Sequence, residues 1–220
     1  MKKAVCIISG GMDSALSAKI AQQEGYEIIA LHFNYGQRTQ NKELECFRKI
    51  AKDVAAIKSH EIDLGFFEQI GASALTDMSI DVPTGGLEEG VPVTYVPFRN
   101  GIFLSISAAV AEKHGAEALF IGVVEEDSSG YPDCRESYIQ QMQKAINMGT
   151  KEETKLEIKM PLVSLQKSDI VKRSLELSVP LEHTWSCYQA QELACGICDS
   201  CRLRLRGFKN AGEVDPIAYA

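Results

Sequence analysis

The residues at positions 9–14, Ser-Gly-Gly-Met-Asp-Ser, indicate chemistry most clearly because of their types and their spacing. They follow an apolar run at residues 4–8 and lead into an amphipathic helical pattern. A strand that passes through a glycine turn into a helix leaves backbone N–H groups without partners. Together with the helix dipole, these groups form a site for a phosphate anion. The paired glycines, Gly10 and Gly11, would let the phosphate approach the backbone closely.

Two better-known phosphate-binding patterns do not fit this turn. The segment has neither the GxxxxGK[ST] spacing of the P-loop nor the GxGxxG spacing of the dinucleotide fingerprint. The alternative to phosphate binding is an ordinary strand-to-helix turn in which Asp13 or Ser14 serves as the N-cap. We expect the phosphate-binding turn.

Four cysteines near the end of the chain form a second candidate site. Cys187, Cys195, Cys198 and Cys201 lie within fifteen residues, and the chain holds seven cysteines in all. Four thiolates suit a closed tetrahedral zinc site, which the last forty residues would need in order to fold. The alternatives are an iron–sulfur cluster, a redox dithiol, or four unligated cysteines.

Polar residues at two further places could hold a planar ligand. Residues 95–100 end a strand-like run just before a helical pattern, and the side chains of Arg99 and Asn100 there could hold a carboxylate or the edge of a base. After an apolar strand at 118–124, Tyr131 could stack on a ring, and Asp133 could accept hydrogen bonds from a guanine-like N–H pair. The alternative for this second segment is a plain turn. Lys167 opens a later helix and could reach a triphosphate.

The elements that must position these residues alternate along the chain. Strand-like runs are expected at 4–8, 27–33, 57–64 and 118–124, and helices at 41–53, around 102–110, at 135–147 and at 167–177. This alternation predicts a doubly wound α/β domain over residues 1–180, with ligands at the carboxyl ends of its strands, followed by a cysteine-containing segment at 181–220. Residues 71–94, which include Glu88 and Glu89, are expected to be an active-site flap or a disordered insertion.

The composition narrows the class of protein. The 220 residues carry a net charge of −7, which argues against broad nucleic-acid binding and against a stable nucleic-acid partner. No apolar run is long enough for a membrane span, and no secretory segment follows the first three residues. We therefore expect a cytoplasmic protein without a membrane partner.

At this point the residues resemble a family. Positions 9–14 resemble the PP-loop of the N-type ATP pyrophosphatases, which adenylate a substrate and release pyrophosphate. With the runs at 35–38, 96–100 and 129–135 and the four cysteines, the whole chain resembles the branch that makes 7-cyano-7-deazaguanine for queuosine biosynthesis. The resemblance implies a Rossmann-like, adenine nucleotide α-hydrolase-like sheet. Three positions depart from the family pattern, namely Met12, Thr39 and Phe98, and the first cysteine spacing is one residue short. Phe98 is expected to reshape the pocket mouth.

The resemblance also implies roles for particular residues. Asp13 would position Mg²⁺, Arg38 and Lys167 would balance charge, and the four cysteines would bind one structural zinc. The implied substrate-binding residues are Arg99, Asn100, Tyr131, Asp133 and Arg135. The implied ATP-binding residues are Ile8, Ser9, Gly10, Gly11, Met12, Asp13, Ser14, Ala15, Leu16, Ser17 and Ala18.

The reaction implied by the resemblance is that of a ligase forming carbon–nitrogen bonds. It would use ATP with Mg²⁺ to convert 7-carboxy-7-deazaguanine and ammonia, through an adenylated carboxylate and an amide, into the nitrile. A homodimer is expected by the same resemblance. Three alternatives stay open at this point: a related ligase that stops at the amide or uses another acceptor, a tRNA-thiolating PP-loop enzyme, and a non-catalytic zinc-knuckle protein that binds nucleic acid.

Overall fold

The computed structural model describes residues 2–86, 90–125 and 130–220. Its centre is a parallel sheet of five strands in the order β3-β2-β1-β4-β5. The strands are β1 (Lys3–Ile7), β2 (Glu27–Asn34), β3 (Lys58–Asp63), β4 (Ala118–Phe120) and β5 (Glu157–Lys159). The predicted doubly wound α/β fold is confirmed. The strand order reverses between β1 and β4, which is where such sheets bind ligands.

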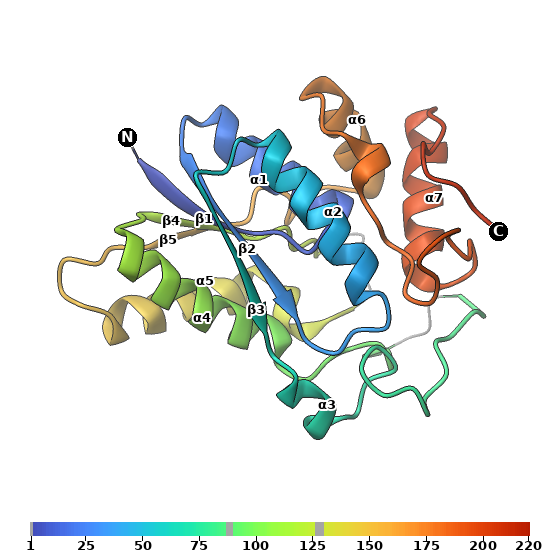
Figure 1. The fold of residues 1–220 in the computed structure, drawn as a ribbon, viewed down its shortest axis with the longest axis horizontal. Coiled ribbons are helices and arrows are strands. Elements are labelled where there is room, and N and C mark those ends of the chain that lie inside the picture. Colours follow the sequence, from blue (N-terminus) through green and yellow to red (C-terminus); the bar gives the residue numbers. More distant parts are fainter. Residues whose placement is uncertain (1, 87–89, 126–129) are drawn as a thin grey trace.

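Helices cover both faces of this sheet (Figure 1). One face carries α1 (Met12–Gln23), α2 (Gln40–Asp53), α6 (Lys167–Glu176) and α7 (Asp199–Ala211). The other carries α3 (Phe66–Ile70), α4 (Arg99–His114) and α5 (Glu136–Gly149). There are also two short 3₁₀ helices: η1 (Pro132–Cys134) lies between β4 and α5 in the chain, and η2 (Leu181–His183) lies between α6 and α7.

The apolar strands form because both of their faces are buried. In β1, Ala4 and Cys6 pack toward α1 and α2, whereas Val5 and Ile7 pack toward α4. Successive side chains of a strand point to opposite faces, so a strand covered on both sides is apolar throughout. The predicted strand at 118–124 is shorter in the structure, where β4 ends at Phe120.

The prediction of a strand just before α4 is wrong. Residues 91–98 form turns and bends, and α4 begins at Arg99. Pro92 and Pro97 lack the N–H groups that a strand would donate to its neighbour. Phe98 has a φ of 54°, a left-handed conformation that a glycine adopts without strain.

The C-terminal segment packs closely on the rest of the chain. Helix α7 lies along α6, and its Phe208 joins the core formed by α1, α2 and α6. The predicted division at residue 180 falls between α6 and η2 and stays a prediction. Across the described residues, none of the helices combines the length and apolar character that a membrane span requires.

Candidate active site

A cavity of about 250 Å³ opens at the carboxyl ends of β1 and β4. One end is formed by the turn after β1 and the start of α1, and the other by the start of α4 and the residues around Tyr131. Lys167 and residues 185–186 close its side. The cavity therefore lies at the switch point of the sheet, as the fold predicts.

The turn after β1 depends on the first of its two glycines. Gly10 has a φ of 97°, and a Cβ there would lie 2.5 Å from the backbone oxygen of Glu43 in α2. The hydroxyl of Ser14 donates to Gly11 O at 2.9 Å and lies 3.1 Å from the hydroxyl of Ser9. These contacts fix the turn in shape. Gly11 is the N-cap, so the alternative in which Asp13 or Ser14 caps the helix is wrong.

The first turn of α1 presents unused amides to the cavity. Its first intrahelical hydrogen bond runs from Ala15 N to Gly11 O at 3.0 Å, so the N–H groups of Met12, Asp13 and Ser14 have no intrahelical acceptor. All three residues line the cavity. The helix dipole adds positive potential at this end. This arrangement is suited to a phosphate anion.

A cation and a carboxylate meet beside these amides. Lys167 Nζ lies 2.5 Å from Asp13 Oδ2, and both side chains line the cavity. Lys167 is the first residue of α6, and Gly207 of α7 lets the two helices approach there, because a Cβ at Gly207 would lie 2.8 Å from that of Lys167. The other oxygen, Asp13 Oδ1, is buried and accepts no hydrogen bond from the described residues.

The opposite end of the cavity holds the guanidinium of Arg99. It lies 5.3 Å from the ring centre of Tyr35, 5.7 Å from that of Phe103 and 5.9 Å from that of Tyr131. Its Nη1 donates to the Tyr35 hydroxyl at 3.0 Å, and its Nε is buried without an acceptor in the described part of the chain. Burial raises the pKa of Tyr35 to about 12, so the phenol stays neutral. Arg99 is a caged cation that forms no ion pair with the described carboxylates.

Asn100 and Asp133 hold this end together. Asp133 is 4 % exposed, and its Oδ2 accepts the backbone N–H of Asn100 at 2.9 Å. Burial raises the pKa of the Asp133 carboxyl. The amide of Asn100 donates to Cys134 Sγ at 3.3 Å, and burial raises the pKa of that thiol to about 12. Asp133 therefore fixes the start of α4 directly, whereas Asn100 and Cys134 line the cavity.

Several residues predicted for the site lie elsewhere. Arg38 donates to the carbonyls of Ala74, Asp77 and Ile80, so it anchors the segment after α3 and does not face the cavity. Arg135 is exposed at the start of α5, and the half-exposed ring of Phe98 packs against Tyr138. Neither residue lines the cavity, and the expected effect of Phe98 on the pocket mouth stays a prediction. The predicted ATP-binding residues that do not line it are Gly10, Ala15, Leu16, Ser17 and Ala18.

The segment at 71–94 packs against the C-terminal segment. Ala74, Ile80 and Val82 contact a small core that contains Trp185 and the cysteines, and none of the described residues of 71–94 lines the cavity. These residues are neither a disordered insertion nor a wall of the cavity. Glu88 and Glu89, and residues 128–129 before Tyr131, lie outside the described residues.

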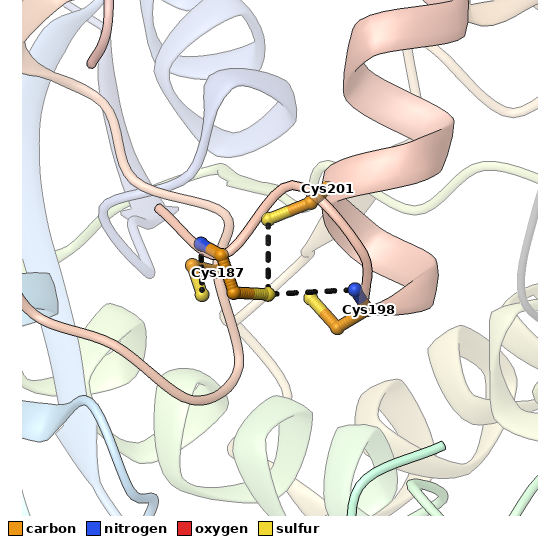
Figure 2. A group of neighbouring side chains, drawn as sticks. Cys187, Cys198 and Cys201 are labelled. Atoms are coloured by element: carbon orange, nitrogen blue, oxygen red, sulfur yellow. Dashed lines mark hydrogen bonds between the residues drawn. The ribbon is translucent and has the colours of Figure 1, made fainter. Parts of the chain in front are cut away.

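The four predicted cysteines come together. The sulfur atoms of Cys187, Cys195, Cys198 and Cys201 all lie within 4.8 Å of one another, and Figure 2 shows three of the side chains turned into one small space. A tetrahedral thiolate site with metal–sulfur bonds of about 2.3 Å has sulfurs about 3.8 Å apart. Hydrogen bonds from the thiols of Cys198 and Cys201 and from backbone amides hold the pKa of Cys187 below its usual range. The cluster fits a metal ion.

Comparison with known proteins decides the family. Residues 3–212 match the family described as queuosine biosynthesis protein QueC. The chain belongs to the QueC family. Within it, the chain is 84 % identical over 218 residues to a protein of Sulfurovum sp. (strain NBC37-1) named 7-cyano-7-deazaguanine synthase, covering 99 % of this chain and 98 % of that protein. A protein of the same name from Aliarcobacter butzleri (strain RM4018) is 68 % identical over 218 residues, covering 99 % and 96 %.

Solved structures outside the QueC family share the fold. A 4-thiouridine synthetase in complex with RNA and ATP superposes with a TM-score of 0.53 at 19 % identity, covering 81 % of this chain and 41 % of that one. A protein of Methanocaldococcus jannaschii described as a predicted subunit of tRNA methyltransferase gives a TM-score of 0.51 at 18 % identity, covering 100 % and 93 %. At such low identity these likenesses concern the fold alone.

Sequence analysis missed several residues of this QueC site. Trp185 and Ser186 line the cavity, but they come from an irregular segment, so no periodic pattern points to them. Arg204 of α7 also lines the cavity, and it belongs to the arginine run after Cys201, whose sequence fits either contact with a triphosphate or a solvated helix face. Gly122 also lines it, and a Cβ there would lie 2.8 Å from the backbone of Asp13. A glycine inside an apolar strand-like run signals a close approach of another backbone, and that signal was available.

Proposed function

We propose that this chain uses ATP to convert 7-carboxy-7-deazaguanine and ammonia into 7-cyano-7-deazaguanine, as a ligase forming carbon–nitrogen bonds. One observation carries the proposal: a single cavity joins the free amides of α1 to the caged cation of Arg99. The first is suited to a triphosphate, and the second to an anionic group on a planar ring. The names of the two relatives at 84 % and 68 % identity support the choice of substrate.

At the phosphate end, the amides of residues 12–14 would bind the pyrophosphoryl part of ATP. Lys167 would add a positive charge beside the phosphates. Mg²⁺ bound with ATP would neutralise the negative charge that develops on the departing pyrophosphate. Asp13 has the donor chemistry for that cation, because its buried Oδ1 has no other partner among the described residues.

At the opposite end, Arg99 would pair with the carboxylate of the deazaguanine. A cation that is enclosed by aromatic rings and forms no ion pair with a described carboxylate binds an anion more strongly than a neutral group, because the low local dielectric strengthens the attraction. The amide and the nitrile are neutral, so Arg99 favours the substrate over the later species. Tyr131 lies beside the same space and would pack on the ring.

The reaction proceeds in two activations. A carboxylate oxygen attacks the α-phosphorus of ATP, the bond to the β-phosphate breaks, and pyrophosphate leaves. Ammonia then attacks the carboxyl carbon, AMP leaves with the oxygen, and a proton is lost to give the amide. The amide oxygen attacks a second ATP in the same way. Loss of this oxygen as AMP, with the two protons of the amide nitrogen, leaves the nitrile.

The finer points of the assembly also belong to this proposal. We assign the four cysteines to one zinc ion that holds the C-terminal segment in place, because four thiolates leave no open position for catalysis. Residues 1–180 would form the ATP-binding part and residues 181–220 the zinc-binding part. The family resemblance supports a cytoplasmic homodimer.

The test is a direct product analysis. The protein is incubated with 7-carboxy-7-deazaguanine, ATP, Mg²⁺ and ammonium, and the products are identified by mass spectrometry. Nitrile with AMP is the expected result. Amide without nitrile would favour a ligase that stops early, and ADP would contradict the release of pyrophosphate.

A pair of arginine variants locates the substrate end. Arg99→Met should raise the KM for the carboxylate substrate by at least tenfold, because the caged charge is lost. Arg173→Met removes an exposed arginine of α6 that pairs with Glu176, and it should leave both KM values unchanged. Equal effects of the two variants would refute the assignment of Arg99.

A further inference from the structure

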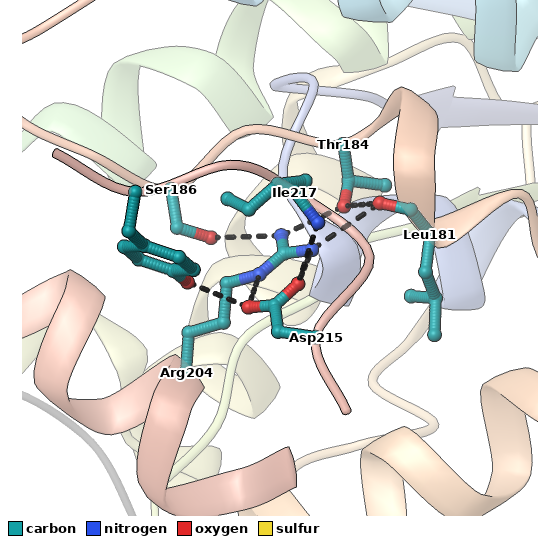
Figure 3. Close-up of polar contacts among 7 residues, drawn as sticks. Leu181, Thr184, Ser186, Arg204, Asp215 and Ile217 are labelled. Atoms are coloured by element: carbon teal, nitrogen blue, oxygen red, sulfur yellow. Dashed lines mark hydrogen bonds and ion pairs between the residues drawn. The ribbon is translucent and has the colours of Figure 1, made fainter. Parts of the chain in front are cut away.

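A buried arginine of α7 has every donor satisfied. The side chain of Arg204 is 1 % exposed, and its five N–H groups all have acceptors (Figure 3). Nε and Nη2 donate to the two carboxylate oxygens of Asp215 at 2.7 and 2.9 Å. Nη1 donates to the hydroxyls of Thr184 and Ser186 at 2.8 and 3.4 Å, and Nη2 also donates to Leu181 O at 3.2 Å. The planar guanidinium therefore holds Asp215 on one side and residues 181–186 on the other.

Two of these partners flank a residue in the cavity wall. Thr184 and Ser186 lie on either side of Trp185, and both Trp185 and Ser186 line the cavity. The backbone N–H of Trp185 donates to Gly10 O at 2.9 Å, in the phosphate-binding turn. Residues 184–186 belong to no helix or strand, so hydrogen bonds and packing from outside the segment set their position.

The other partner belongs to the end of the chain. The side chain of Asp215 is 4 % exposed, and besides Arg204 it accepts from the hydroxyl of Tyr219 at 2.6 Å and from the N–H of Ile217 at 3.2 Å. The tail is held in turn by the backbone pairing of Tyr219 with Ala194. Asp215 and Tyr219 lie beyond residue 212, where the match to the QueC family ends.

We propose that Arg204 and Asp215 are positioning residues that set the affinity of the cavity for the nucleotide. Asp215 neutralises and orients Arg204, and Arg204 holds Thr184 and Ser186, so that the backbone of Trp185 stays against the phosphate-binding turn. A buried ion pair is sensitive to loss of one partner, because the remaining charge is left uncompensated. Loss of the Asp215 charge therefore acts at the phosphate end, whereas Arg99 lies at the opposite end and is unaffected.

The variant Asp215→Asn tests this directly, because it keeps the size of the side chain and removes its charge. We expect the dissociation constant for ATP with Mg²⁺, measured by calorimetry without turnover, to rise at least fivefold. In the turnover assay, the KM for ATP should rise similarly, whereas the KM for the carboxylate substrate and kcat should change less than twofold. Trp185 is the single tryptophan, so its emission should also shift in the variant.

A matched control separates positioning from general loss of stability. Glu213→Gln removes an exposed carboxylate two residues earlier in the same tail, and it should leave ATP affinity and Trp185 emission unchanged. Tyr219→Phe removes only the hydroxyl that donates to Asp215, so it gives a milder change of the same kind if Asp215→Asn does not fold.

The proposal is overturned if Asp215→Asn, or Tyr219→Phe in its place, lowers the melting temperature while ATP affinity and Trp185 emission stay as in the parent. It is equally overturned if the KM values of both substrates rise together. Because ATP binding is measured without the deazaguanine, failure of the proposed reaction leaves this test intact, and the two failures are distinguishable.

Discussion

The substitution Gly122→Ala should impair catalysis more than its size indicates. Gly122 follows β4 by two residues and lies directly against the first turn of α1. A Cβ there would meet the backbone C and O of Asp13 at 2.8 Å and the backbone N of Ser14 at 2.9 Å. Its φ is not in the left-handed region, so the effect comes from close approach and not from backbone strain.

The size of the effect follows from these distances. Ordinary contacts begin near 3.4 Å, so the first turn of α1 must move away by about 0.6 Å. Overpacking of this kind costs about 1–3 kcal/mol of unfolding free energy, which leaves a protein of ordinary stability folded. A misplacement of about 1 Å at a site can cost about 100-fold in rate, so we expect kcat/KM to fall about tenfold or more, or at least about 1.4 kcal/mol of transition-state stabilisation.

The assay compares this variant with Gly149→Ala. Gly149 ends α5 and lacks a positive φ, and a Cβ added there would have no other atom within 4 Å. Alanine at this position should therefore be neutral or stabilise the protein by about 0.4–1 kcal/mol. Both variants are measured for ATP dissociation constant, kcat/KM and unfolding by denaturant. The reasoning is refuted if Gly122→Ala binds ATP and turns over like the parent while it is destabilised.

Three further predictions concern other parts of the molecule. Phe98→Gly should change kcat/KM less than twofold, because the ring lies outside the cavity. It should change the unfolding free energy by less than about 1 kcal/mol, because relief of the left-handed conformation offsets the lost ring contact. A large rise in substrate KM would contradict this prediction. Cys201→Ser should reduce bound zinc, measured by mass spectrometry, from one per chain to near zero and expose the C-terminal segment to protease; full zinc content would contradict the four-thiolate site. Burial and neighbouring positive charges lower the pKa of both His60 and His114, whose Nε2 atoms lie 3.1 Å apart, so the folded state resists their protonation and unfolding free energy should fall as pH drops below about 6.5. His114→Gln should make that slope measurably shallower, by up to about 1 kcal/mol over two pH units because the pair is largely solvated, and an unchanged slope would contradict the assignment.

The sequence predicted the central strands of the sheet because these strands are buried on both faces. The apolar runs around Ala4 and Ile28 are short, as expected of strands covered on both faces, and both form central strands. The run before Arg99 has a similar apolar content, but the prediction of a strand there was wrong, because Pro92 and Pro97 remove the donors that a strand needs. There the backbone chemistry outweighs the hydrophobic pattern.

Some site residues could be predicted from nearby sequence, whereas others depend on contacts with distant segments. The turn around Gly10 and the cysteine cluster were predictable, because the residue types that mark each of them lie close together in the sequence. The position of Arg38 was not, since its three carbonyl partners come from a segment whose path follows no periodic rule. Arg204 likewise stands in a run of alternating arginines and leucines that gives no sign of which arginine is buried.

The two cationic side chains of the cavity, Lys167 and Arg99, differ in whether they already pair with a carboxylate. Lys167 already pairs with Asp13, so the charges at the start of α1 are balanced. Under the proposed function, the attraction of this end for phosphate would therefore come largely from backbone amides. Arg99 has no such partner among the described carboxylates, so its charge is available to an anion on the second substrate. In the proposed function, a carboxylate held there would face the α-phosphate of a nucleotide bound at the other end of the same cavity. The two ends would therefore bind anions in different ways: the first through hydrogen bonds from backbone amides, and the second through the charge of a guanidinium.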